Sequence, residues 1–163
     1  MQRNKIADAL KGFTVLDDEP IESAFDKVLR SLTVPLSRPV EEVIDDCIER
    51  ERQISGCMDT GLVLADLAPA RGFTSTLILA LGVSAHGIRW RWEDGSSHTG
   101  SPALIAHFVL IVLSPDDPTR MRALRPSARI FAADREPGSS ILGATSLEQV
   151  TGIARAFEDS GPG

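Results

Sequence analysis

The chain has 163 residues, of which 42% are hydrophobic and 25% are charged, and its formal net charge is −6. These values fit one globular domain, residues 1–163, with a full-sized core. The acidic balance disfavours nucleic acid and anionic membranes as partners, because both repel a negatively charged surface. The longest strongly apolar run, Leu104 to Leu113, is too short to span a bilayer, so no membrane insertion is expected.

The cysteines and the N-terminus indicate a reducing compartment. Cys47 and Cys57 have neither the spacing of a metal site nor that of a redox pair, and we expect one on a helix face and one in a loop. Met1 to Lys5 is polar and no long apolar run follows, which argues against a signal peptide. The expected location is therefore cytoplasmic.

The first half of the chain predicts two helices before a short strand. A first strand is expected near residues 13–16. Acidic residues, Pro20 and an apolar period of 3.6 predict a helix over 20–32, and the same period predicts a second helix from about 40 to 52. Leu62, Val63 and Leu64 form a short apolar run after Gly61, which predicts a buried strand.

The second half predicts three strands and two helices. Residues 76–83 and 104–113 read as buried strands, and alternation over 88–93 predicts a half-buried strand with Trp90 and Trp92 on one side. A helix is expected after Ser114–Pro118, with an apolar face formed by Met121, Leu124, Ala128 and Phe131. Pro126 should kink or split that helix. A loop is expected over 134–140. Residues 145–148 read as a capping box that begins the last helix.

Residues 49–66 read E-R-E-R-Q-I-S-G-C-M-D-T-G-L-V-L-A-D. This stretch resembles the type-2 enzyme IIA domain of the bacterial phosphoenolpyruvate-dependent sugar phosphotransferase system, the mannitol, fructose and nitrogen-regulatory kind. That family reads R-E and then S-T-G-x-G-x-G-x-A-x-P-H, where the histidine accepts a phosphoryl group. Aligned without gaps, Arg50 and Glu51 match R-E, Ser55 matches the serine, and Asp66 falls on the phosphorylated histidine.

The resemblance extends from about Ile6 to Phe157, and the turn before residue 118 matches the family's L-L-T-P-x-D-D. It implies a single α/β domain in which one mixed sheet is flanked by helices on both faces. Cys57 and Asp59 replace two family glycines, and a gapped alternative pairs Pro69-Ala70 with P-H. Both alignments leave the phosphorylated histidine missing.

The resemblance also implies a site. Arg50 falls on a family arginine that helps to hold the phosphoryl group, and Arg120 falls on a second family histidine. We expect Asp66, Arg50 and Arg120 to meet in one surface cleft. The alternatives are that Asp66 caps loop N–H groups, that Arg50 only faces its own helix dipole and that Arg120 is a solvated first-turn residue.

Without the histidine, a non-phosphorylatable regulatory module that binds another protein is the expected function. That partner would be a phosphotransferase component or a regulatory target, and a homodimer is possible. One alternative is an active phosphocarrier in sugar uptake or nitrogen-regulatory phosphotransfer, which would use Asp66 or a histidine. Another is a small-ligand-binding domain in the inherited cleft. No cofactor is expected, and no metal, because His86, His98 and His107 lack ligand spacing.

Overall fold

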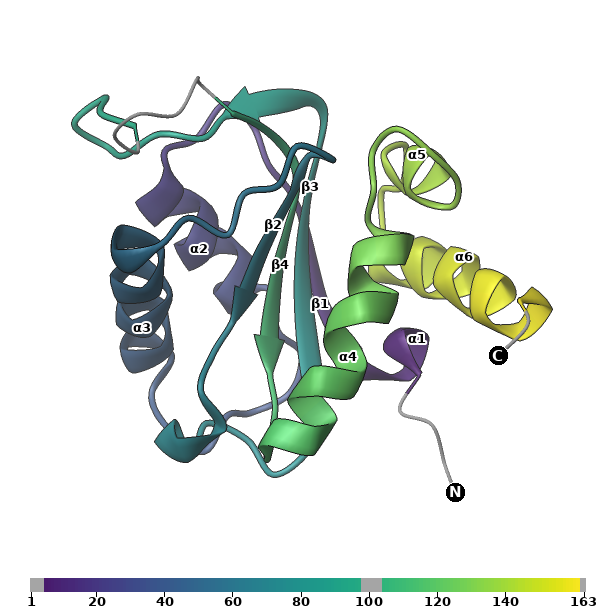
Figure 1. Ribbon diagram of the computed structural model, residues 1–163, viewed down its shortest axis with the longest axis horizontal. Helices are drawn as coiled ribbons and strands as arrows, with labels where there is room; N and C mark the ends of the chain where they lie inside the picture. The colour runs from purple at the N-terminus through teal and green to yellow at the C-terminus, as the bar shows by residue number, and fades with distance from the viewer. Residues whose placement is uncertain (1–4, 98–103, 162–163) are drawn as a thin grey trace.

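The computed structural model describes residues 5–97 and 104–161, which form one mixed four-stranded sheet between two layers of helices (Figure 1). The strands are β1 (Leu10–Val15), β2 (Leu62–Asp66), β3 (Ile78–Arg89) and β4 (Ile105–Leu113), in the order β1-β3-β4-β2. β1 is parallel to β3 and β2 to β4, whereas β3 and β4 are antiparallel. The expected mixed sheet is confirmed.

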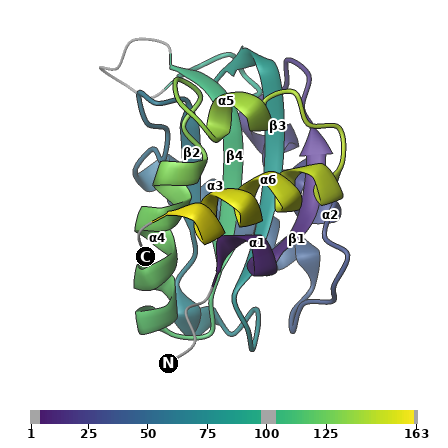
Figure 2. The same cartoon turned by 90° about the vertical axis from the view of Figure 1, so that its right-hand side faces the viewer.

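Two helices cover one face of the sheet and four cover the other (Figures 1 and 2). α2 (Ile21–Arg30) and α3 (Val40–Gln53) pack on the face that carries Val63, Val109 and Ile111. The opposite face carries the remaining helices. These are α1 (Ile6–Ala9), α4 (Asp117–Ile130), α5 (Gly138–Ile141) and α6 (Leu147–Ser160). The sheet is thus buried on both sides, which accounts for its nearly continuous apolar strands.

The predicted strand at Leu62–Leu64 is confirmed as β2, an edge strand whose three apolar side chains are buried. Its outer edge is paired with the preceding loop: the Met58 N–H donates to the Leu62 carbonyl (2.8 Å), and the Leu64 N–H donates to the Gly56 carbonyl (3.0 Å). A β-carbon at Gly56 would lie 2.3 Å from the Leu64 carbonyl oxygen, so this approach requires glycine. The loop therefore closes an edge that would otherwise be open.

The strand predicted over 76–83 continues through an irregular register between Val83 and Ile88 and ends at Arg89 as β3. The separate strand predicted over 88–93 is wrong, because only its first two residues are in β3. The extra residues form a bulge that lets the strand continue, so the polar residues near His86 do not end it. Trp90 and Trp92 lie beyond the strand, yet both are buried in the core beneath α2 and α3, as their spacing predicted.

Helix α4 differs from its prediction in two ways. It runs through Pro126 as one element and is not split. Met121 is 59% exposed, whereas the other predicted face residues, Leu124, Ala128 and Phe131, pack against the core. The buried residues within the helix are Thr119, Ala123, Ser127 and Ile130. The predicted apolar face is therefore correct except at Met121, and it also includes Ala123 and Ile130.

The C-terminal segment also departs in detail from the sequence interpretation. α5 occupies part of the loop expected over 134–140. The capping interaction of α6 begins one residue later than expected: the Ser146 hydroxyl accepts from the Gln149 N–H (3.2 Å), and the Gln149 side chain accepts from the Thr145 N–H (2.7 Å). Across the described part of the chain, none of the helices has the length and apolar character needed to cross a membrane.

The burial of β2 can be tested with Val63→Asp. The substitution would place a carboxylate without a partner in the core, so we expect a loss of about 3 kcal/mol or more and a fall in Tm of about 6–12 °C. Val15→Asp is the matched control, because Val15 is 53% exposed on the opposite edge strand. A Val63→Asp melting temperature within a degree of the parent would contradict the placement of β2.

Candidate functional site

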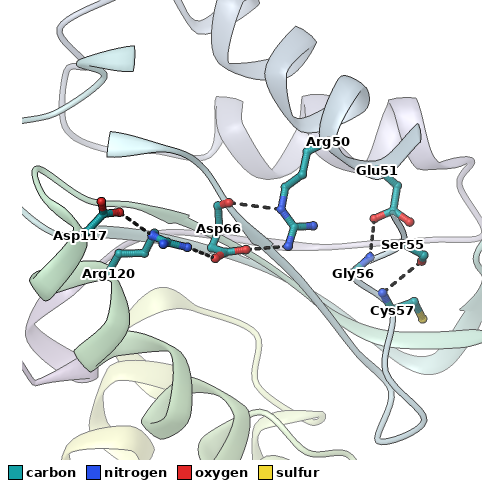
Figure 3. A network of polar contacts seen from close by, with 8 residues as sticks. All are labelled: Arg50, Glu51, Ser55, Gly56, Cys57, Asp66, Asp117 and Arg120. Carbon is teal, nitrogen blue, oxygen red and sulfur yellow. Dashed lines mark hydrogen bonds and ion pairs between the residues drawn. The ribbon is translucent and has the colours of Figure 1, made fainter. Parts of the chain in front are cut away.

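Asp66 lies at the carboxyl end of β2 and is bound by an arginine from each layer of helices (Figure 3). Arg50 of α3 donates from Nη2 to Asp66 Oδ1 at 2.6 Å, and Arg120 of α4 donates from Nη1 to Asp66 Oδ2 at 2.8 Å. The Asp66 side chain is 11% exposed and the two arginine side chains are each 27% exposed. The carboxylate is therefore held at both oxygens by charge-assisted hydrogen bonds.

Local structure places each arginine. Arg50 is in the last turn of α3, where a cation also faces the negative end of the helix dipole, and its Nε donates to the Asp66 carbonyl (3.2 Å). Arg120 is in the first turn of α4, which begins at the N-cap Asp116, and its Nε donates to Asp117 (3.2 Å). The hydrogen bond to Asp66 is the main cause that raises the pKa of Arg120, so this guanidinium stays charged.

The structure brings together the three residues that the sequence singled out. The Asp66 carboxylate contacts both guanidinium groups directly, and it is not in a loop but on the last residue of a strand. Arg120 is not a solvated first-turn residue, and Arg50 both faces its helix end and binds Asp66. Asp66, Arg50, Arg120 and Asp117 together carry two positive and two negative charges. The cluster is thus neutral and internally paired.

The comparisons with known proteins concern the fold. No protein-family model matches the chain, and a search of curated proteins found no match. Among solved structures, the nitrogen regulatory protein IIA-Ntr from Neisseria meningitidis superposes with a TM-score of 0.66 at 16% identity, covering 91% of this chain and 98% of that one. The mannitol IIA of Escherichia coli gives 0.61 at 12% identity, covering 91% and 96%.

A third solved structure agrees with these two. The mannitol-specific cryptic phosphotransferase enzyme IIA from Escherichia coli gives a TM-score of 0.62 at 14% identity, covering 93% of this chain and 99% of that one. This chain has the enzyme IIA fold. The fold that the resemblance implied is confirmed. Sequence identities this low do not justify assigning the activity of one protein to another.

The gapped alignment places the missing histidine at Ala70. In this enzyme IIA fold Ala70 is an exposed residue of the short 3₁₀ helix Pro69–Arg71, beyond the end of β2. It offers no side-chain group to either arginine. Asp66 is the residue that both arginines contact, so the gapless alignment is the one that gives a coherent cluster.

Glu51 is a buried polar residue that the sequence interpretation did not single out. Glu51 is 1% exposed, and its carboxylate accepts from the Gly56 N–H (3.0 Å; Figure 3). It also accepts from the Trp90 indole N–H (3.0 Å). A β-carbon at Gly56 would lie 3.1 Å from Nη1 of Arg50, so the loop passes close to this guanidinium. Glu51 thus ties the end of α3 to the loop that borders the site. The match of Glu51 to the second residue of the family's R-E pair was the one sequence feature that could have pointed to it.

The cysteines and histidines lie apart from this cluster. Cys47 is buried in the core and Cys57 is half-buried in the loop, both as free thiols, as expected. His86 is in the β3 bulge and His107 is in β4, while His98 falls outside the described residues. Over residues 5–97 and 104–161, no three His, Cys, Asp or Glu side chains are placed to share a metal ion.

Cys57 provides a test of the loop structure. Burial, with a smaller contribution from Glu51, raises the pKa of the Cys57 thiol to about 12, so only about one molecule in ten thousand carries the thiolate at pH 8. In a Cys47→Ala variant, we expect Ellman's reagent to label native Cys57 at least about 100-fold more slowly than the protein in guanidinium chloride. Rapid stoichiometric labelling of the native protein would contradict this environment.

Proposed function

We propose that this protein is a non-phosphorylatable regulatory relative of enzyme IIA that acts by binding another protein, either a phosphotransferase component or one of its regulatory targets. The observation that supports the proposal is the carboxylate of Asp66 held between two arginines, at the position where the resembling family carries its phosphorylated histidine. A partner would meet this charge pattern between α3 and α4.

In this proposal the charge of Asp66 stands in for that of a phosphohistidine. A phosphoryl group carries nearly two negative charges and three acceptor oxygens, and basic side chains hold it. Asp66 offers one charge and two oxygens, already bound by Arg50 and Arg120, and it has a shorter reach than a phosphorylated imidazole. The mimicry is partial, and the domain is kept permanently in a state resembling the phosphorylated one.

The geometry disfavours a phosphocarrier that uses Asp66. An attacking carboxylate oxygen needs an open approach to phosphorus, but both oxygens already accept hydrogen bonds and the side chain is largely buried. Aspartyl phosphate formation usually needs further acids that hold Mg²⁺. Asp59, the acid nearest in sequence, precedes Leu62, which lies about 13 Å from Asp66 along β2. Asp117, the acid of the cluster, is bound by Arg120.

The described histidines do not replace the missing one. The backbone N–H of His107 donates to the Gly61 carbonyl (2.7 Å), which places His107 beside the start of β2, whereas Asp66 is at its end. His86 is in the bulge of β3, in the same region of the sheet. Neither imidazole is near the two arginines that would stabilise a phosphoryl group.

Incubation with phosphoenolpyruvate and the general phosphotransferase proteins, followed by intact-mass spectrometry at neutral pH, tests the proposal. We expect no gain of a phosphoryl group, while an enzyme IIA that retains its histidine is fully modified in the same reaction. A stoichiometric phosphate on Asp66 or on any histidine would sink the proposal.

The proposed binding to a partner is tested by measuring the binding of the parent and of Asp66→Asn to immobilised phosphotransferase components. The substitution removes the charge but keeps the side-chain shape, so binding should weaken while the fold is retained by circular dichroism. Asp45→Asn, on the exposed side of α3, is the matched control and should bind like the parent. Equal binding by parent and Asp66→Asn would contradict recognition through this charge.

A further inference from the structure

A second candidate site lies at the opposite end of β2 from Asp66. A cavity of about 470 Å³ opens between the loop before β2, the start of β4 and the loop after α4. The side chains that matter for its chemistry are Met58, Asp59, Leu104, Ile105, His107 and Asp134. Its size is within the range of cavities that bind small molecules.

Backbone hydrogen bonds hold the walls of this cavity together. The Ala133 N–H donates to the Thr60 carbonyl (3.1 Å), which joins the loop after α4 to the loop before β2. The N–H groups of His107 and Phe108 both donate to the Gly61 carbonyl, at 2.7 and 3.0 Å. All three walls are thus connected before any ligand arrives, and a ligand would bind with little reorganisation.

The imidazole of His107 is fixed in one orientation. Its Nδ1 lies 2.9 Å from the Ser84 carbonyl, which can only accept, so Nδ1 carries the proton and Nε2 is the remaining nitrogen. Two glycines leave room for the ring: a β-carbon at Gly61 would lie 3.1 Å from Cδ2, and one at Gly87 would lie 3.0 Å from Cε1. Both Ser84, which binds Nδ1, and Gly87, which leaves room for the ring, belong to the bulge of β3.

The two carboxylate side chains that line the cavity make it acidic. Asp59 and Asp134 supply carboxylate oxygens, His107 presents Nε2, and Thr60 adds a hydroxyl group, while the described lining residues include neither lysine nor arginine. Leu104 and Ile105 add apolar surface between them. A matching ligand therefore donates hydrogen bonds, carries positive charge and has an apolar body, and the net charge of −6 also favours a cation.

We propose that this cavity binds an aliphatic diamine, with an ammonium group at each end of a short methylene chain. A single metal ion does not match, because no three described His, Cys, Asp or Glu side chains converge on one point. A diamine can reach acceptors spread around a cavity, while its methylenes pack on Leu104 and Ile105. This site shares no residue with the Asp66 cluster and does not depend on the proposed function.

Titration calorimetry of the whole chain with 1,4-diaminobutane tests the site, with butylamine and butane-1,4-diol as comparators. We expect binding in the order diamine, monoamine, diol, with no measurable heat for the diol. Asp59→Asn and Asp134→Asn should each weaken diamine binding about three- to fivefold, as expected for one exposed charge pair, and the double variant should lose about tenfold or more. In ¹⁵N spectra, the diamine should shift the His107 imidazole resonances.

Asp45→Asn/Glu49→Gln is the matched control, because it removes the same two charges from the exposed side of α3. It should leave the dissociation constant within about twofold of the parent value. The proposal is overturned if the diamine gives neither heat nor an imidazole shift, if the diol binds as well as the diamine, or if this control weakens binding as much as the cavity variants do.

Discussion

The bonds from one carboxylate to two arginines link the helical layers on either side of the sheet. Asp66 ends the edge strand β2, Arg50 comes from α3 on one face and Arg120 comes from α4 on the other. All three side chains are at least half-buried, so removing Asp66 leaves Arg50 without an ion-pair partner in a partly desolvated place, whereas Arg120 keeps Asp117. The cluster forms only if the end of β2, the end of α3 and the start of α4 lie next to one another. The loop bound by Glu51 supports that arrangement.

The same arrangement limits the chemistry of the site. In the family that the sequence resembles, two imidazoles face a surface where a phosphoryl group comes and goes. In the gapless alignment Asp66 and Arg120 fall on those two positions, and in the structure they form an ion pair. In the proposed function this permanent charge holds a recognition surface in one state and does not report phosphorylation. This chain shares the enzyme IIA fold with solved structures to which it is only 12 to 16% identical, so many different sequences can form this fold.

The sequence was sufficient to predict β2, the mixed sheet and the meeting of Asp66 with Arg50 and Arg120, because these depend on apolar runs, element order and a positional resemblance. The apolar face of α4 was predicted correctly at Leu124, Ala128 and Phe131 but not at Met121, which is 59% exposed. The contacts of Glu51 with Gly56 and Trp90, and the cavity beside His107, depend on how segments distant in sequence pack. No local pattern encodes such contacts.

The central claim is that Asp66 is energetically coupled to both arginines, and double-mutant cycles on unfolding free energy test it most directly. The cycles pair Asp66→Ala with Arg50→Ala and with Arg120→Ala, and the exposed pair Arg38 and Glu42 serves as control. The account predicts a coupling of about 1–2 kcal/mol for each Asp66 pair, against about 0.3–0.5 kcal/mol for the control. Effects that add within about 0.5 kcal/mol at both Asp66 pairs would contradict it.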